Sequence, residues 1–196
     1  CVATRVRELT TDLMAWGPLQ GIALHKVAVS HIPGRGLGIV ATDEIAAGEL
    51  VLRAPHSVLL TGDASSLSVL GQTNALALAL LQERAKGAAS KWAPYLATLP
   101  QTFSTPLFFN VSEQAALRGT DLIHWMRARE ANVARTHEFL LSQGSALTVD
   151  ARTGNAASGF TLDDFSWALS VAWSRSHASI GLLQCWLIEC TSTFFL

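Results

Sequence analysis

The sequence predicts an α+β domain in which a region of short strands and turns is followed by a mainly helical region. Short apolar runs separated by glycine and proline occupy residues 23–60, whereas the next hundred residues contain long segments rich in alanine and leucine. With 196 residues and a mass of 21.0 kDa, the chain is long enough for one domain with a core and short for two.

The first part of the chain combines one helical pattern with several strand patterns. Residues 5–20 place apolar side chains on one side of a helix. Residues 23–32 alternate between apolar and polar positions, and a glycine-rich turn at 33–38 leads into another strand. Two further apolar runs, at 50–52 and 58–60, complete the predicted strands.

The later part of the chain contains two long helical segments and a polar segment. Residues 74–86 and 122–141 are rich in residues that favour helices. The small, polar residues at 144–159 predict a surface loop.

A further helix is predicted to begin at Thr161 and to run to about His177. Thr161 and Asp164 have the spacing of a capping-box variant, in which each side chain satisfies a backbone N–H of the first turn. Phe160 and Phe165 flank this start where a hydrophobic staple would place them.

Charge and hydropathy exclude two kinds of partner. The formal net charge is -1 and the pI is about 6.6, so the chain lacks the basic stripe that binds nucleic-acid phosphates. The apolar residues 180–196 contain Gln184 and Glu189 and are short for a membrane span, which needs about 20 residues. We therefore expect neither a nucleic-acid nor a membrane partner.

The cysteines and histidines favour a reducing compartment and predict no metal site. Cys1, Cys185 and Cys190 form no CxxC pair, and an odd number argues against a disulfide framework. His56 and His124 are isolated from further ligand residues, so a structural zinc is not expected.

The glycines at 34, 36 and 38 admit two interpretations. A dinucleotide-binding fingerprint has the form GxGxxG and opens a helix, but this run opens the strand-like Ile39 and Val40. Local spacing therefore favours a hairpin turn. Glycines also let a ligand approach the backbone closely, so the turn could bind a ligand as well.

Ser174, Arg175 and His177 suggest an alternative catalytic site. On a helix that continues to His177, Ser174 and His177 could share a face, as a nucleophile and its base would. No GxSxG elbow surrounds Ser174. The preferred interpretation is a helix C-terminus at which Arg175 and His177 complement the helix dipole.

Several segments together resemble a SET-domain protein methyltransferase of the Rubisco large-subunit methyltransferase-like subfamily. Residues 34–55 resemble the opening of the SET domain over some twenty positions. Residues 92–100, 105–108 and 117–122 resemble the helical insert of that subfamily, and residues 165–175 resemble the helix that re-enters the SET fold.

The resemblance implies transfer of a methyl group from S-adenosylmethionine to a protein lysine, or to a histidine in some relatives. The residues that would hold the cofactor are Arg35, Gly36, Leu37, Gly38 and Arg175. Arg175 would also help to form the substrate site. His177 would help to line the lysine channel, at a position where the subfamily commonly has an aromatic residue.

The resemblance also implies a SET domain that is C-terminally truncated. Family members complete the site with an Asn-His pair and a tyrosine beyond the arginine, but this chain has no Asn-His dipeptide, and its one tyrosine is Tyr95. Resemblance ends after Ser179. The sequence therefore assigns no catalytic residue, and we expect little or no catalysis by this chain alone.

By this resemblance the chain divides into four parts. Residues 20–62 would be the N-terminal part of the SET domain, 63–160 the helical insert, 161–179 the re-entry helix and 180–196 a tail outside the family. The expected function is that of a protein-lysine N-methyltransferase, acting as a monomer on a protein substrate. The alternative is a non-catalytic fragment that binds a protein through the insert. Plastid, cytosol and nucleus all fit the family.

Overall fold

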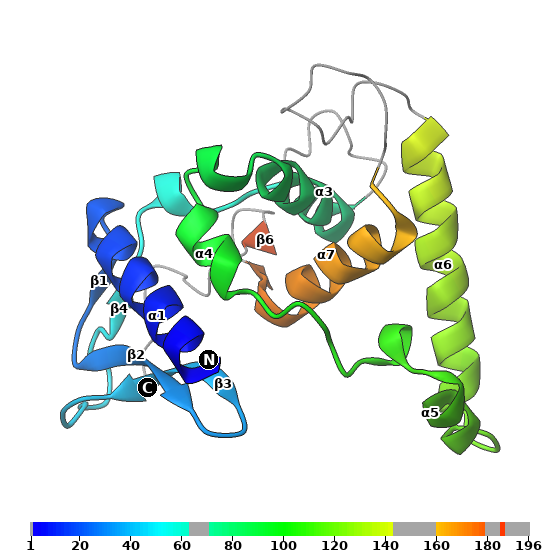
Figure 1. Cartoon of the computed structure of the whole chain (residues 1–196), viewed down its shortest axis with the longest axis horizontal. Helices are drawn as coiled ribbons and strands as arrows, with labels where there is room; N and C mark the ends of the chain where they lie inside the picture. The colour runs from blue at the N-terminus through cyan, green and yellow to red at the C-terminus, as the bar shows by residue number, and fades with distance from the viewer. Residues whose placement is uncertain (1, 63–70, 143–159, 179–184, 187–196) are drawn as a thin grey trace. The chain divides into compact units, whose positions relative to one another are not determined.

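The computed structural model describes residues 2–62, 71–142, 160–178 and 185–186 (Figure 1). The chain forms two compact units. Unit 1 comprises Cys1–Thr61, Ala88–Leu99 and Arg175–Leu196, and unit 2 comprises Gly62–Gly87 and Pro100–Ser174. Within the described ranges, no helix combines the length and the apolar character that crossing a membrane requires.

Unit 1 carries the strands, which pair antiparallel in two-stranded sheets. The pairs are β1 (Ala23–Leu24) with β4 (Leu52–Arg53), β2 (Val27–Ile32) with β3 (Gly36–Ala41), and β5 (His177–Ala178) with β6 (Cys185–Trp186). The hairpin of β2 and β3 is the strand, turn and strand that the alternation and the glycines predict. The strand expected at 50–52 begins later, as β4.

Two helices of unit 1 pack together beside the β2–β3 hairpin. Helix α1 (Val2–Leu19), predicted from its apolar stripe, contacts α4 (Ala93–Thr98) and β2. The indole of the buried Trp16 donates a hydrogen bond to the carbonyl oxygen of Lys91 at 2.8 Å. This bond ties α1 to the segment that leads into α4.

The strand expected at residues 58–60 is absent, and this expectation is wrong. The segment begins with the 3-10 helix η1 (His56–Val58), in which the Val58 amide donates to the Pro55 carbonyl at 3.1 Å. The indole N–H of Trp92 donates a hydrogen bond to the Val58 carbonyl at 2.8 Å. Val58, Leu59 and Leu60 are buried, so their apolar character reflects core packing and not strand pairing.

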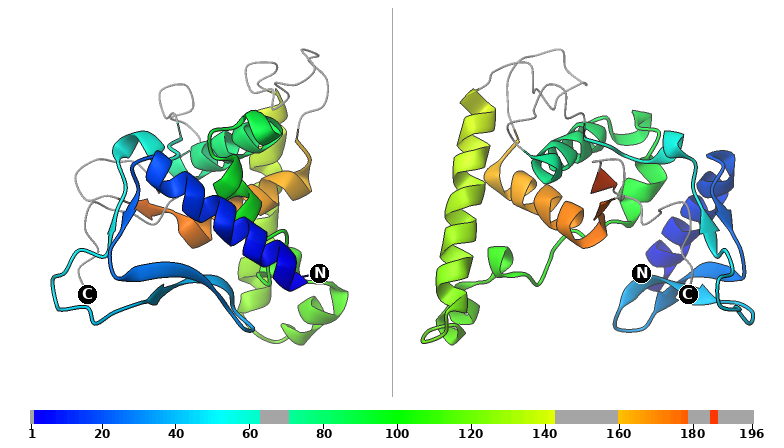
Figure 2. Two further views of the ribbon diagram at one scale, coloured as in Figure 1. Left: turned by 60° about the vertical axis from the view of Figure 1, so that its left-hand side comes forward. Right: turned by 180° about the vertical axis from the view of Figure 1, so that it is seen from behind.

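Unit 2 is built from helices. The two predicted long helices are α3 (Gln72–Ala85) and α6 (Leu122–Ser142), and the capped helix is α7 (Leu162–Arg175). Shorter elements of unit 2 are α5 (Val111–Ala116) and the 3-10 helix η4 (Pro106–Phe108). The 3-10 helix η3 (Gly87–Ala89) has its first residue in unit 2 and the other two in unit 1. Figure 2 shows α7 running beside α3, with α6 as a long straight helix.

The start of α7 has the capping box that the sequence predicts. The Asp164 amide donates to Thr161 Oγ1 at 3.1 Å, and the Thr161 amide donates to Asp164 Oδ2 at 3.1 Å. The rings of Phe160 and Phe165 lie 5.7 Å apart, as a hydrophobic staple requires. His137 of α6 contributes its Nε2 atom to a 2.8 Å hydrogen bond with the Phe160 carbonyl.

Helix α7 is buried along most of its length in unit 2. Phe165, Leu169 and Val171 are at most 2% exposed. Trp167 donates its indole N–H to the Pro100 carbonyl at 2.8 Å, and the Arg84 guanidinium of α3 lies 4.1 Å from the centre of its ring. The surface loop predicted at 144–159 lies outside the described residues.

Candidate functional site

The glycine-rich segment is the tight turn that joins β2 to β3. The Arg35 amide donates to the Ile32 carbonyl at 3.0 Å, which closes a turn with Pro33 and Gly34 at its centre. Gly34 has φ 74°, and proline followed by a residue with positive φ is typical of a type II turn. Gly36 has φ 82°, a conformation that strongly favours glycine.

The glycines of this turn serve different purposes. A Cβ atom added at Gly34 or Gly36 would meet no atom within 4 Å, so the backbone there faces open space. A Cβ atom at Gly38 would lie 2.7 Å from Cδ1 of Ile32, the residue diagonal to it across the hairpin. Gly38 therefore makes room for a neighbouring side chain, whereas Gly34 and Gly36 leave the backbone accessible to a ligand.

The predicted cofactor residues of this turn lie on both faces of the hairpin. Gly36 and Gly38 share one face of β3, and Leu37 is on the other, because side chains alternate along a strand. Arg35 is exposed at the tip of the turn. The four residues thus share an open backbone and a cationic tip, but they do not form one side-chain surface.

An ion pair that sequence analysis missed fixes the loop after β3. Lys26 Nζ lies 2.7 Å from Glu49 Oε1 and donates to the Glu44 carbonyl at 2.8 Å. Glu49 Oε2 also accepts the Ala46 amide at 2.9 Å. The glycine-glutamate pair at 48–49 is part of the family-like motif, and in this chain the glutamate closes a loop.

The surroundings of Glu49 favour its charged form. The hydrogen bond from Lys26, followed by that from the Ala46 amide, holds the pKa of the Glu49 carboxyl below its usual value. Lys26 has a φ of 54°, which is uncommon for residues other than glycine. This backbone angle cannot be read from the sequence, so it gave no signal for the ion pair.

The second group of predicted site residues follows α7. Arg175 is the last residue of α7 and is half-buried, and His177 lies in β5, where it is paired with Trp186 of β6. The helix expected to reach His177 therefore ends two residues earlier. Residues 177–178 pair with β6 and are therefore extended, so they do not continue the helix.

This boundary removes the geometry that a Ser174–His177 hydrolase site needs. Ser174 lies in α7 and His177 in β5, so the two residues do not share a helix face. The Ser174 hydroxyl donates to the Ser170 carbonyl at 2.8 Å and approaches the Val171 carbonyl at 3.1 Å. It has the local bonding of a helical serine, and no observation supports a nucleophile here.

The structure places both groups of predicted residues in unit 1. Arg35, Gly36, Leu37 and Gly38 are adjacent on the hairpin, and Arg175 and His177 are adjacent at the junction of α7 and β5. A joint site formed by the two groups remains a prediction. Among the described residues, no group of three or more histidine, cysteine, aspartate or glutamate side chains could hold a metal ion.

Solved structures identify the fold. The SET domain of LSMT bound to lysine and AdoHcy matches with a TM-score of 0.77 and 21% identity, covering 94% of this chain and 44% of that chain. Rubisco LSMT bound to AdoMet matches with a TM-score of 0.72 and 23% identity over 87% of this chain and 41% of that chain. The protein thus has the SET-domain fold, over part of the length of those structures.

The sequence is similar to those of actin-histidine N-methyltransferases. An actin-histidine N-methyltransferase of Gallus gallus is 30% identical over 201 residues, which cover 89% of this chain. Those of Homo sapiens and Danio rerio are also 30% identical, over 89% and 91% of this chain. The chain spans 33% of the length of each of these relatives. No family model matches the sequence.

Proposed function

We propose that the protein is an S-adenosylmethionine-dependent protein N-methyltransferase that modifies a side-chain nitrogen of lysine or histidine. The observation that carries this proposal is the open, glycine-containing hairpin at the position where the sequence resembles a SET-domain cofactor loop. Two further observations support it: the relatives are named as histidine methyltransferases, and a solved structure of the same fold was bound to AdoMet.

The hairpin fits such a cofactor in two respects. The absence of neighbouring atoms around Gly34 and Gly36 lets a ligand lie against the backbone. The exposed guanidinium of Arg35 suits a carboxylate, and S-adenosylmethionine carries one on its methionyl part. We assign Arg35, Gly36, Leu37 and Gly38 to cofactor binding, with Arg175 at both cofactor and substrate and His177 at the substrate.

For methyl transfer, the main task of this chain would be to align the cofactor with the substrate nitrogen. When bound, the cofactor would supply a sulfonium methyl group. A neutral side-chain nitrogen would form the new N–C bond as the S–C bond breaks, and a proton would then leave to solvent, from the methylated amine of lysine or from the other ring nitrogen of histidine. Arg35, Gly36, Leu37 and Gly38 of the hairpin would hold the cofactor in a fixed position, and such positioning of the reacting groups lowers the barrier. The Lys26–Glu49 ion pair would act indirectly, by fixing the loop that follows β3.

We expect this chain to bind the cofactor but to transfer little or no methyl group. Its one tyrosine, Tyr95, lies in α4, and it contains no Asn-His dipeptide, so the groups that the resemblance calls for in catalysis are not evident. Cofactor binding by the 196 residues is therefore the primary test, and methyl transfer to a protein is expected to be absent or very weak.

Isothermal titration with S-adenosylmethionine tests the assignment. Arg35→Ala should weaken binding about tenfold, because one charge-assisted contact is lost. Arg53→Ala is the matched control, since Arg53 is an exposed arginine on β4 of the same unit. Equal affinities of Arg35→Ala and the unmodified chain would remove Arg35 from the site. A folded chain that binds no cofactor would refute the proposed function.

A further inference from the structure

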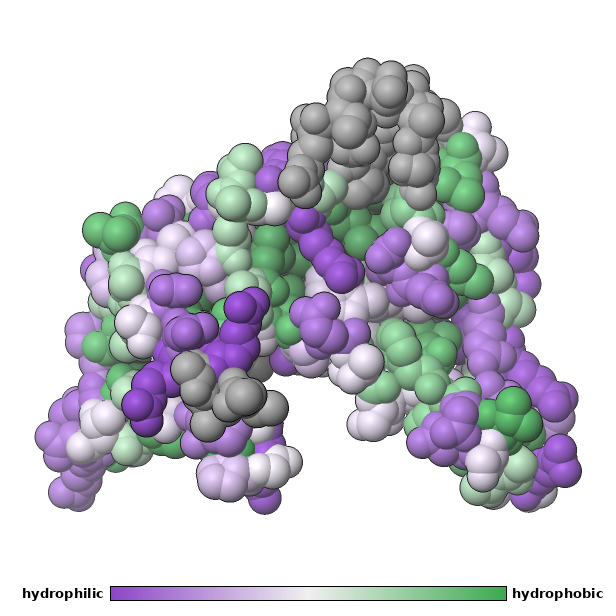
Figure 3. All heavy atoms as spheres, in the orientation of Figure 1, coloured by the Kyte–Doolittle hydropathy of each residue, from purple (hydrophilic) through white to green (hydrophobic). Residues whose placement is uncertain are grey.

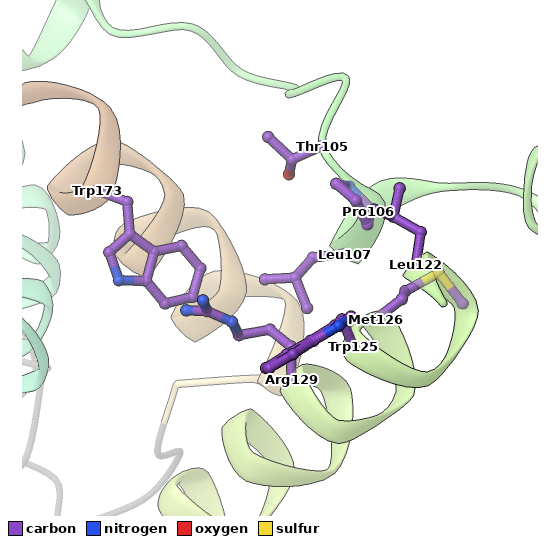
Figure 4. A pocket seen from close by; sticks show the side chains of 8 residues that line it. All are labelled: Thr105, Pro106, Leu107, Leu122, Trp125, Met126, Arg129 and Trp173. Atoms are coloured by element: carbon purple, nitrogen blue, oxygen red, sulfur yellow. The ribbon is translucent and has the colours of Figure 1, made fainter. Parts of the chain in front are cut away.

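A cavity in unit 2 is lined by none of the residues assigned above. Its volume is 520 Å³, within the range of about 300–1,000 Å³ that ligand-binding cavities occupy. Figure 4 shows side chains from three places in the sequence around it: the η4 segment, α6 and the end of α7. The lining residues are Thr105, Pro106, Leu107, Leu122, Trp125, Met126, Arg129 and Trp173.

The apolar side chains at this cavity are unusually exposed. Trp125 is 75% exposed, Leu122 52% and Trp173 41%. Figure 3 shows hydrophobic residues mixed with hydrophilic ones at the lower right, where α5 and the start of α6 lie. Exposed tryptophan next to arginine is the composition of binding hot spots in protein interfaces, where a few such residues carry most of the binding energy.

Arg129 gives the cavity its charge. It is the one charged residue among those that line the cavity, and its guanidinium carbon lies 4.5 Å from the centre of the Trp173 ring. Stacking covers one apolar face of the guanidinium and leaves its N–H edges for another group. Within the part of the chain that the structure describes, Arg129 forms no ion pair.

We propose that this surface, the Trp125–Arg129 groove, binds a short peptide segment of a partner protein that presents one large apolar side chain flanked by carboxylates. The apolar side chain would lie against Leu122 and Trp125, and a carboxylate would pair with Arg129. A small molecule fits less well, because such ligands are usually 70–90% enclosed and Trp125 stands mostly in solvent. A cationic ligand would be repelled by Arg129.

Fluorescence polarisation with synthetic peptides tests the groove without any cofactor. The probe is a labelled peptide with a central phenylalanine flanked by glutamates. Two matched peptides replace the phenylalanine with alanine or the glutamates with lysines. We expect the whole chain to bind the probe at least about tenfold more tightly than either matched peptide.

Variants on α6 locate the binding. Trp125→Ala and Arg129→Glu should each weaken probe binding by about tenfold. Arg127→Glu makes the same charge change on an exposed position of the same helix outside the cavity, and should change affinity by less than about twofold. Circular dichroism of each variant checks that it is folded.

Three results would overturn the proposal. One is absence of probe binding by the folded chain. Another is equal weakening by Arg127→Glu and Arg129→Glu, which would indicate a diffuse charge effect. The third is self-association in sedimentation that Trp125→Ala abolishes, since the groove would then bind a second copy of the chain.

Discussion

Glycines at two positions leave room for very different neighbours. A Cβ atom at Gly38 would meet only the end of the Ile32 side chain, at 2.7 Å, whereas one at Gly62 would lie 2.6 Å from the backbone nitrogen of Leu76. A side chain can rotate away, but the backbone of α3 cannot. We expect Gly38→Ala to cost about 1 kcal/mol or less and Gly62→Ala about 2–3 kcal/mol. Chemical denaturation measures both, and equal losses would contradict this account.

The Lys26–Glu49 ion pair predicts a dependence on pH. The pKa of Glu49 is lowered in the folded chain, so its stabilising contribution is present above the ordinary glutamate pKa, about 4.3, and is lost as the pH falls through the lowered value. Lys26→Met should raise this pKa, because the largest cause of the shift is removed. A carbon-detected NMR titration of Glu49 measures it. An unchanged pKa in the variant would show that Lys26 does not set it.

The start of α7 offers a test at the level of a whole element. Thr161→Ala removes the hydroxyl that accepts the Asp164 amide and should lower the free energy of unfolding by about 1 kcal/mol. Thr161→Ser keeps the hydroxyl and serves as the control. If both variants were equally destabilised, the loss would come from the methyl group and not from the cap.

Elements with strong local signals are the ones that sequence analysis predicts. The α7 capping box, the hairpin at Gly34 and Gly36, and the long helices α3 and α6 all follow from residues close in sequence. The errors arise where distant segments decide. The strand expected at 58–60 is an example, because the carbonyl oxygens of Ser57 and Val58 accept hydrogen bonds from Lys91 and Trp92, which lie 34 residues later in the sequence.

Over the whole molecule, the fold was predictable from the sequence, whereas several contacts around the candidate site were not. Some twenty family-like positions at 34–55 indicated the SET domain, and the solved structures confirm that fold. The same motif did not reveal that Gly38 accommodates Ile32 or that Glu49 closes a loop, because both depend on contacts across strands. The groove at Trp125 and Arg129 was also missed, because it joins residues from three separate segments.

The central claim is that the β2–β3 hairpin binds the cofactor of a methyltransferase. Hydrogen–deuterium exchange of the whole chain with and without saturating S-adenosylhomocysteine tests it most directly. The account predicts slower exchange of amides at residues 33–41 and 174–178, with no change along α6. Protection along α6 alone, or no protection anywhere despite measured binding, would contradict the assignment of the cofactor to this hairpin.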